Sequence, residues 1–182
     1  MDFQDTPIDG LRIVRMNVFS DDRGWFGRSF CQREFAGAGM EDIVWTQMNH
    51  SFTAERGSIR GLHYQIPPFS EAKLVRCISG AVFDVAVDLR RGSSTFGNWF
   101  GTALSAANRE ALFIPAGFAH GFQTLEPNSE LIYQHTSFYE PGFEGGIRYD
   151  DPTLGIPWPL PLTLISERDR SLPYLDPAFA GI

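Results

Sequence analysis

The clearest pattern of apolar and polar positions runs from Val82 to Leu89. In an extended strand, the odd-numbered residues of this stretch, all apolar, share one face and the even-numbered residues share the other. Two carboxylates, Asp84 and Asp88, interrupt the second face. The pattern predicts a strand, and it leaves open whether the aspartates form a polar or charge-paired lining or lie solvated on an outer surface.

Comparable patterns, separated by turn residues, cover most of the chain. They predict strands over residues 11–19, 25–30, 43–50, 58–65, 97–104, 111–115, 118–125 and 130–138. One short helix is expected over 32–40. The Pro-rich tail from residue 150 is expected to wrap around the strands as irregular structure, with one turn or short helix near 166–171. Turns spaced by roughly ten residues favour an antiparallel sandwich or barrel.

Composition supports a globular protein made mainly of strands. The chain has 182 residues, 43% of them apolar and 14% aromatic, which suits one domain spanning residues 1–182. Its net charge of −7 disfavours nucleic acid as a partner, although a few arginines in a pocket can still bind a nucleotide. We expect no membrane helix and no signal peptide. Cys31 and Cys77 are expected as free thiols, so we expect a cytoplasmic protein.

Two histidines, His63 and His120, lie in predicted strands close to glycines, where a ligand can approach the backbone. The spacing Pro-x-Gly-x-x-His that ends at His120 resembles the second motif of the cupin superfamily. The first cupin motif supplies two histidines and a glutamate, but here Gln65 replaces the second histidine. Because amides are poor ligands for the metals that imidazole suits, we expect no metal. The alternative is a metal-dependent isomerase or dioxygenase that uses His63, Glu71 and His120.

A metal-free pocket with these residue types suits epimerisation. A histidine such as His63 accepts a proton near neutral pH, and a tyrosine such as Tyr133 returns one to the opposite face. Lys73 would stabilise an oxygen that becomes negative. A carboxylate would fix the histidine tautomer, and Asp169 is a candidate. Taken alone, Lys73 and Arg76 also fit a solvated pair on an edge strand.

Several segments, in a fixed order, carry a resemblance to a known family over nearly the whole chain. They are Asp22–Phe26, Gln47–Ser51, Arg60–Gln65, Lys73–Cys77, Phe83–Arg90, Ile114–Phe122, Tyr133–Pro141, Trp158–Pro159 and Ser166–Asp169. The chain resembles the dTDP-4-dehydrorhamnose 3,5-epimerase family. The resemblance implies an all-β, cupin-type jelly-roll barrel with short peripheral helices, and a homodimer whose sites are completed across the interface. It also implies epimerisation at C3 and C5 of a nucleotide-linked 4-keto-6-deoxyhexose, without metal or cofactor.

The resemblance implies a role for individual residues. His63 would be the general base with Asp169 as its partner, and Tyr133 would be the acid on the other face. Lys73 would stabilise the enolate oxygen at C4, with His120 nearby. The remaining implied residues bind the nucleotide sugar: Arg60 at the diphosphate, Arg23 at the nucleotide across the dimer interface, Tyr139 stacked on the base, and Phe26, Arg28, Gln47, Asn49, Glu144 and Arg168 along the site.

Three positions depart from the family pattern. Arg28 stands where a glutamate is usual, Arg168 where a lysine is common, and Met48 where an aspartate is common. Arg28 replaces a hydrogen-bond acceptor with a cationic donor, so the base of the nucleotide stays open. A C3-only epimerase, an enzyme for another nucleotide sugar, and a non-catalytic nucleotide-sugar-binding module also stay open as alternatives.

Overall fold

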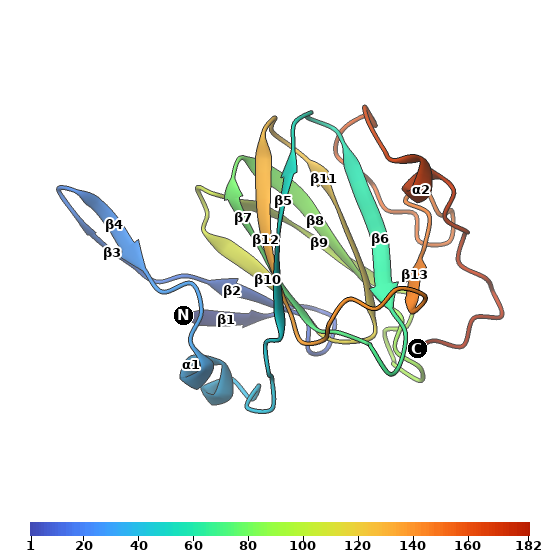
Figure 1. Cartoon of the computed structure of the whole chain (residues 1–182), viewed down its shortest axis with the longest axis horizontal. Coiled ribbons are helices and arrows are strands. Elements are labelled where there is room, and N and C mark those ends of the chain that lie inside the picture. Colours follow the sequence, from blue (N-terminus) through green and yellow to red (C-terminus); the bar gives the residue numbers. More distant parts are fainter.

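The computed structural model describes residues 1–182, and most of its regular structure is strand (Figure 1). In chain order the elements are β1 (Asp2–Asp5), β2 (Arg12–Arg15), β3 (Val18–Asp21), β4 (Gly24–Gly27), α1 (Gln32–Gly37), β5 (Gln47–Thr53), β6 (Ile59–Gln65), β7 (Lys73–Ser79), β8 (Ala81–Asp88), β9 (Trp99–Ser105), β10 (Glu110–Ile114), β11 (Phe118–Thr124), β12 (Ser129–His135), β13 (Glu144–Gly146) and α2 (Glu167–Arg170).

Two antiparallel sheets form the body of the molecule. One has the strand order β1-β2-β10-β7-β12-β5, and the other has the order β13-β6-β11-β8-β9. A core cluster between them combines Leu112 and Leu131 of the first sheet with Val82 and Phe122 of the second. The two sheets therefore enclose a barrel-like interior, and the predicted all-β jelly-roll fold is confirmed. Neither helix is long and apolar enough to cross a membrane.

The strand β8 is buried on both faces. Its even-numbered apolar residues belong to the core between the sheets, whereas its odd-numbered valines pack against Leu154 and Ile156 of the C-terminal tail. The tail therefore covers the outer face of the five-stranded sheet. Asp84 and Asp88 are fully buried and are bonded to His120 and Arg90, so they form a paired polar lining and are not solvated.

Several strand boundaries differ from the sequence prediction. Residues 11–19 form two strands, because the chain leaves the six-stranded sheet after β2 and β3 pairs only with β4. The strand predicted over 43–50 begins at Gln47. The sequence pattern does not predict β1 or β13, and it offers β7 only as a possible edge strand that carries Lys73 and Arg76. Of these, β1 and β13 are short segments that become regular only because a neighbouring strand pairs with them.

The strand β7 overturns one interpretation made from the sequence. Lys73 and Arg76 are not a solvated pair on an edge strand, because β7 lies inside the six-stranded sheet between β10 and β12. Lys73 is buried, and Arg76 is half-buried with its guanidinium donating to the carbonyls of Arg109 and Ser29. Because both side chains are at least partly withdrawn from solvent, their charged groups are bonded within the protein, Lys73 to Glu71 and Arg76 to backbone carbonyls.

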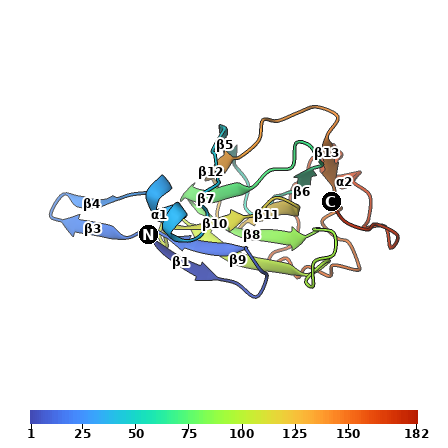
Figure 2. The same cartoon turned by 90° about the horizontal axis from the view of Figure 1, so that it is seen from below.

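The hairpin formed by β3 and β4 projects away from both sheets (Figures 1 and 2). Three of its large apolar side chains are exposed, and Phe19, Trp25 and Phe26 keep 76%, 53% and 74% of their surface accessible. A lone two-stranded hairpin is marginally stable in water, and clustered exposed apolar side chains mark an interaction surface. The hairpin therefore carries an apolar surface that the two sheets leave uncovered.

The pairing of β6 with β11 sets the positions of two histidines. His63 lies directly opposite His120, and the register shifts immediately after this pair. The two strands approach closely at Gly121, where an added Cβ would lie 2.7 Å from the Arg60 carbonyl oxygen and 2.8 Å from the Leu62 Cδ2. Only glycine fits there without moving one strand away from the other.

Gly121→Ala should therefore destabilise the protein by about 1–3 kcal/mol, the usual cost of overpacking. The free energy of unfolding in urea measures this effect. Gly37→Ala is the matched control, because an added Cβ there meets nothing within 4 Å and the residue is helical. The control should be neutral or more stable by up to about 1 kcal/mol. Equal stabilities for the two variants would contradict the close-approach argument.

Candidate active site

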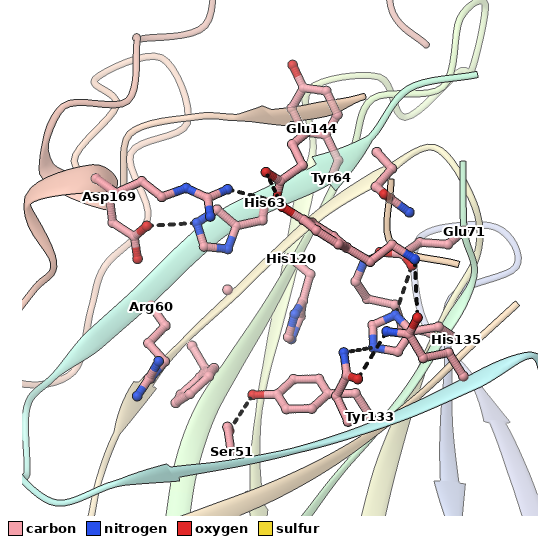
Figure 3. Close-up of a pocket in the computed structure, with 18 of the residues that line it drawn as sticks. Ser51, Arg60, His63, Tyr64, Glu71, His120, Tyr133, His135, Glu144 and Asp169 are labelled. Atoms are coloured by element: carbon pink, nitrogen blue, oxygen red, sulfur yellow. Dashed lines mark hydrogen bonds and ion pairs between the residues drawn. The ribbon is translucent and has the colours of Figure 1, made fainter. Parts of the chain in front are cut away.

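A cavity of about 420 Å³ lies between the inner faces of the two sheets. Strands β5, β6, β7, β11 and β12 line it, together with the segment around β13 and the helix α2 (Figure 3). The cavity contains every candidate residue named from the sequence except Arg23, Phe26 and Arg28. Most of its lining side chains are polar or charged, so it suits a polar ligand better than an apolar one.

His63 on β6 is held by a carboxylate from α2. Its Nε2 is 2.8 Å from Asp169 Oδ1, and the other carboxylate oxygen accepts the backbone N–H of Gly61 at 3.1 Å. Ser166 caps α2 by accepting the backbone N–H of Asp169. Burial alone would raise the pKa of Asp169, but the hydrogen bonds from His63 and Gly61 outweigh burial and lower it. Since Nε2–H donates to this ionised carboxylate, the Nδ1 lone pair is left to accept a proton.

Tyr133 faces the cavity from the opposite sheet. It lies on β12, its ring packs against the apolar core, and its hydroxyl is 3.0 Å from the Ser51 hydroxyl on β5. Burial raises the pKa of Tyr133, and the hydrogen bond with Ser51 only partly opposes this effect. The phenol is therefore protonated at neutral pH. His120 lies between His63 and Tyr133 in Figure 3, and the ring centroids of His120 and Tyr133 are 6.1 Å apart.

His120 has a buried carboxylate of its own. Its Nε2 is 2.9 Å from Asp84 Oδ2, and both side chains are almost completely buried. The other oxygen, Asp84 Oδ1, has no hydrogen-bond partner. A buried carboxyl group is costly without a hydrogen-bond partner, so the bond to the His120 imidazole stabilises the inner wall of the cavity.

Lys73 and His135 share one carboxylate. Glu71 forms an ion pair with the Lys73 ammonium, and its second oxygen is 2.9 Å from His135 Nδ1. The side chains of Lys73, Glu71 and His135 expose 9%, 10% and 9% of their surface. Lys73 and His135 are directly opposite each other in the β7–β12 register. The pairing of these strands therefore brings two basic groups to the same carboxylate.

The cavity also carries groups that suit a nucleotide diphosphate. The Arg60 guanidinium donates hydrogen bonds to the Thr53 hydroxyl at 3.0 Å and to the Phe52 carbonyl at 3.1 Å. The guanidinium remains partly exposed. Arg168 Nη2 donates a hydrogen bond to Glu144 Oε1 at 2.8 Å, and the Tyr139 hydroxyl donates one to Glu144 Oε2 at 3.1 Å. Guanidinium groups bind phosphate through paired hydrogen bonds, and an exposed tyrosine ring offers a face for stacking.

A chain of amides connects this region to His135. Asn49 Nδ2 is 3.3 Å from His135 Nε2, and Asn49 Oδ1 accepts Gln47 Nε2 at 3.0 Å. Gln47 Oε1 in turn accepts the backbone N–H of Tyr139 at 3.2 Å. The two amides on β5 therefore link the interior of the cavity to the segment that carries Tyr139.

Three candidate residues lie outside the cavity of their own chain. Arg23 is in the hairpin turn, where its guanidinium pairs with Asp21. Phe26 is on β4 and exposed, and Arg28 follows β4 and pairs with Glu34 at 2.9 Å. The hairpin carries these side chains away from the two sheets, so one chain by itself does not gather the full set of candidates.

Three pairings around the cavity do not follow from the sequence. Asp84 stands out on β8, but only the β8–β11 pairing shows that its partner is His120. His135 lies two residues after Tyr133 on the same strand, so the two-residue period could have indicated it. Glu71, considered from the sequence only as a possible metal ligand, precedes β7 and is bound instead to Lys73 and His135.

The residues of the metal-dependent alternative line the same cavity but do not form a cluster of metal ligands. His63, Glu71 and His120 are each bound to a different partner, and no three His, Cys, Asp or Glu side chains form a group that could hold a metal ion. Gln65 is buried and accepts the backbone N–H of Glu140, so its amide holds a neighbouring loop. The geometry gives this alternative no support.

The antiparallel jelly roll, with a cavity of paired acids and bases between its sheets, defines a protein of the cupin type. The model of the dTDP-4-dehydrorhamnose 3,5-epimerase family matches residues 5–177. The chain therefore belongs to this family, as the motifs in its sequence predict.

Characterised relatives agree along almost the whole chain. The dTDP-4-dehydrorhamnose 3,5-epimerase of Pseudomonas aeruginosa is 53% identical over 164 residues, 90% of each chain. The crystal structure of the Bacillus anthracis enzyme, with TDP and PPi bound, has a TM-score of 0.93 and 38% identity and covers 96% of this chain and 99% of that one. The Legionella pneumophila enzyme, in complex with dTDP-4-keto-L-rhamnose, has a TM-score of 0.90 and 39% identity over 95% and 92% of the two chains.

Asp169→Asn should reduce the dependence of stability on pH at acid pH. Because the pKa of Asp169 is lowered from 3.8 in the folded protein, its ionised form contributes stability above that pH, and the contribution is lost as pH falls through the folded pKa. Free energies of unfolding, measured in urea at pH values from about 2.5 to 6, test this. The difference in the free energy of unfolding between the wild type and Asp169→Asn should become smaller toward acid pH. A constant difference would mean that the ionised carboxylate adds no stability.

Proposed function

We propose that this protein epimerises C3 and C5 of dTDP-4-dehydro-6-deoxy-D-glucose to give dTDP-4-dehydro-L-rhamnose. The observation that carries the proposal is the pair of proton-transfer groups on facing sheets. His63, held by Asp169, and Tyr133, with its phenol protonated, line the same cavity. Membership of the family supports the same reaction. The chemistry needs no cofactor, because a ketone next to each carbon already makes the C–H bond acidic.

The reaction follows from the positions of the two groups. His63 removes the proton from the carbon next to the C4 ketone, and the bonding pair moves to the carbonyl to form an enolate. The resulting imidazolium is stabilised by Asp169, 2.8 Å away. Tyr133 then gives its proton to the opposite face of the flat enolate, which inverts the centre. His63 then releases its proton to solvent and Tyr133 regains one, so that the same steps on the other side of the ketone invert the second carbon.

The enolate oxygen requires positive charge close to C4. Lys73 supplies an ammonium in the cavity, and the His120 imidazole lies on the adjoining wall. In a site with little water such charges act more strongly than in solution, because the dielectric response is weaker. Both groups are held by carboxylates before substrate arrives, so they need little reorganisation during the reaction.

We assign the diphosphate to Arg60 and Arg168 and the stacking of the base to Tyr139. The Bacillus anthracis relative binds TDP, which supports a thymidine nucleotide. The departure at Arg28 does not remove every acceptor from that region, because the Glu34 carboxylate is 2.9 Å from it. Competition of dTDP, UDP, CDP and GDP against the substrate identifies the preferred base.

His63→Asn should reduce exchange at C3 and C5 by about a thousandfold or more, since the side chain loses its basic nitrogen. NMR in deuterium oxide with purified protein and the dTDP-4-keto-6-deoxyglucose substrate measures incorporation at each carbon. Exchange at both carbons in the wild type is expected. Exchange at C3 alone would identify a C3-only epimerase, and binding without any exchange would identify a non-catalytic module. Retained exchange in the variant would remove His63 from the role of base.

Tyr133→Phe should separate exchange from inversion. His63 can still remove and return a hydrogen on its own face, so recovered substrate should gain deuterium. Product formation should fall by about a hundredfold or more, because no acid remains on the opposite face. Deuterium in the substrate and the yield of product are measured in the same NMR samples. Equal losses of exchange and product would contradict a role confined to reprotonation.

We propose that the protein is a homodimer in which the β3–β4 hairpin of one protomer completes the site of its partner. The exposed apolar side chains of the hairpin and the position of Arg23 and Phe26 outside their own cavity support this arrangement. We also propose that it works in the cytoplasm, where its two free cysteines, Cys31 and Cys77, would stay reduced.

Mixing two inactive variants tests the shared site. His63→Asn and Arg23→Ala should each be nearly inactive as pure dimers. After dissociation and reassociation, half of the dimers are mixed and each mixed dimer has one intact site, so activity should recover to about a quarter of the wild-type value. Light scattering should report twice the 20.4 kDa chain mass. A monomer, or no recovery on mixing, would overturn the shared site.

A further inference from the structure

The β3–β4 hairpin pairs with no strand of either sheet, so its direction is set by side-chain contacts and by the segments at its ends (Figures 1 and 2). One such contact comes from Arg109, in the turn between β9 and β10. Its guanidinium carbon lies 5.4 Å from the centre of the Trp25 ring on β4. A guanidinium over an indole face is an attractive contact, so Arg109 connects the hairpin to the main body of its own chain.

The contact with Arg109 involves one face of the hairpin. Trp25 is paired with Ser20, and Phe19 with Phe26. Residues directly opposite each other share a face of a sheet, and successive residues along a strand alternate between faces. Trp25 therefore lies on the face that meets Arg109, whereas Phe19 and Phe26 lie on the other face, where both remain largely exposed.

The backbone at Arg109 adopts a conformation that suits glycine. Its φ angle is +57°, in the left-handed region that glycine adopts readily and that costs an arginine free energy. Hydrogen bonds fix the turn around it: Asn108 Oδ1 accepts the backbone N–H groups of Ser105 and Glu110, and the Arg109 N–H donates to the Ser105 carbonyl. The turn itself does not require an arginine, so the contact with Trp25 gives this side chain its role.

Arg76 fixes the same turn to the segment through which the chain leaves the hairpin. Its Nη1 donates to the Arg109 carbonyl at 2.6 Å, and its Nη2 donates to the Ser29 carbonyl at 3.3 Å. Ser29 lies shortly after the end of β4, and Arg76 lies on β7, inside the six-stranded sheet. One guanidinium therefore holds both the turn that carries Arg109 and the base of the hairpin against the sheet.

We propose that Arg109 is a positioning residue for the site of the partner protomer. Through Trp25 it orients the β3–β4 hairpin, so that Arg23 and Phe26 reach the nucleotide bound in the partner's cavity. Arg109 does not line the cavity of its own chain, so its effect on the reaction is exerted on the other protomer. This inference rests on the proposed homodimer with shared sites.

Arg109→Gly removes the guanidinium and leaves a residue that suits the φ angle of the turn. In the pure dimer, KM for the nucleotide sugar should rise by about tenfold, the effect of losing one good cation–π contact. The kcat value should change by no more than about twofold, because the hairpin contacts the nucleotide and not the reacting carbons. The thermal midpoint should not fall, which separates this role from a contribution to stability.

Asn128→Gly is the matched control. Asn128 is the other non-glycine residue with a positive φ angle, at +56°, and its side chain is exposed outside the cavity. This variant should leave KM unchanged. Arg109→Lys keeps a cation that can reach the Trp25 ring, so it should recover most of the loss seen in Arg109→Gly. A KM in Arg109→Gly equal to that of Asn128→Gly would contradict the inference.

Two mixed dimers with the same substitutions, purified through a different affinity tag on each chain, test whether Arg109 acts on the partner. In the first, one chain carries His63→Asn and the other carries Arg109→Gly. Its working site belongs to the Arg109→Gly chain and receives an unaltered hairpin, so KM should equal the wild-type value. In the second, one chain carries both substitutions and the other is wild type. Its working site receives the altered hairpin, so KM should be raised by about tenfold.

The two mixed dimers contain the same substitutions, so a general loss of stability does not distinguish them. Equal KM values, or a raised KM in the first mixed dimer, would overturn this inference while the shared site stands, provided that His63→Asn and Arg23→Ala recover activity on mixing. Without that recovery, the shared site and the role of Arg109 fail together. A wild-type dimer that shows no exchange at C3 or C5 would instead overturn the proposed epimerisation, and this inference with it.

Discussion

The burial of carboxylates beside histidines is the interaction on which this structure depends. Three such pairs surround the cavity: His63 with Asp169, His120 with Asp84, and His135 with Glu71. A buried carboxylate without its partner destabilises a protein by several kcal/mol. Each pair therefore requires its two elements to keep their relative positions. The same histidine–carboxylate pairs hold the acid and base groups of the site in place before substrate binds.

The partners in these pairs come from different parts of the chain. Asp169 is supplied by α2 in the tail, Asp84 by β8, and Glu71 by the segment before β7. The Pro-rich tail covers the outer face of the five-stranded sheet, and its apolar contacts with β8 help to position the helix that holds His63. Packing on the outside of the barrel is in this way connected to the chemistry inside it.

Much of this arrangement could be predicted from the sequence. Alternation predicts β8, and the order of the motifs correctly indicates the family. The four residues expected to act together, His63, Lys73, Tyr133 and Asp169, line one cavity. The failures have physical causes. Lys73 looks like a surface residue because the sequence does not show that its side chain lines the cavity between the sheets. Residues 11–19 look like one strand because the break between β2 and β3 arises where the hairpin leaves the sheet.

The all-β class, the family and the residue types needed for proton transfer follow from the sequence, because they depend on local periodicity and on motifs within short segments. Which carboxylate meets which histidine, the burial and charge compensation of Lys73, and the position of Arg23 and Phe26 outside the cavity emerge only in the folded chain. Those features depend on strand order and register between distant segments. Spacing along a chain does not specify which strands become neighbours.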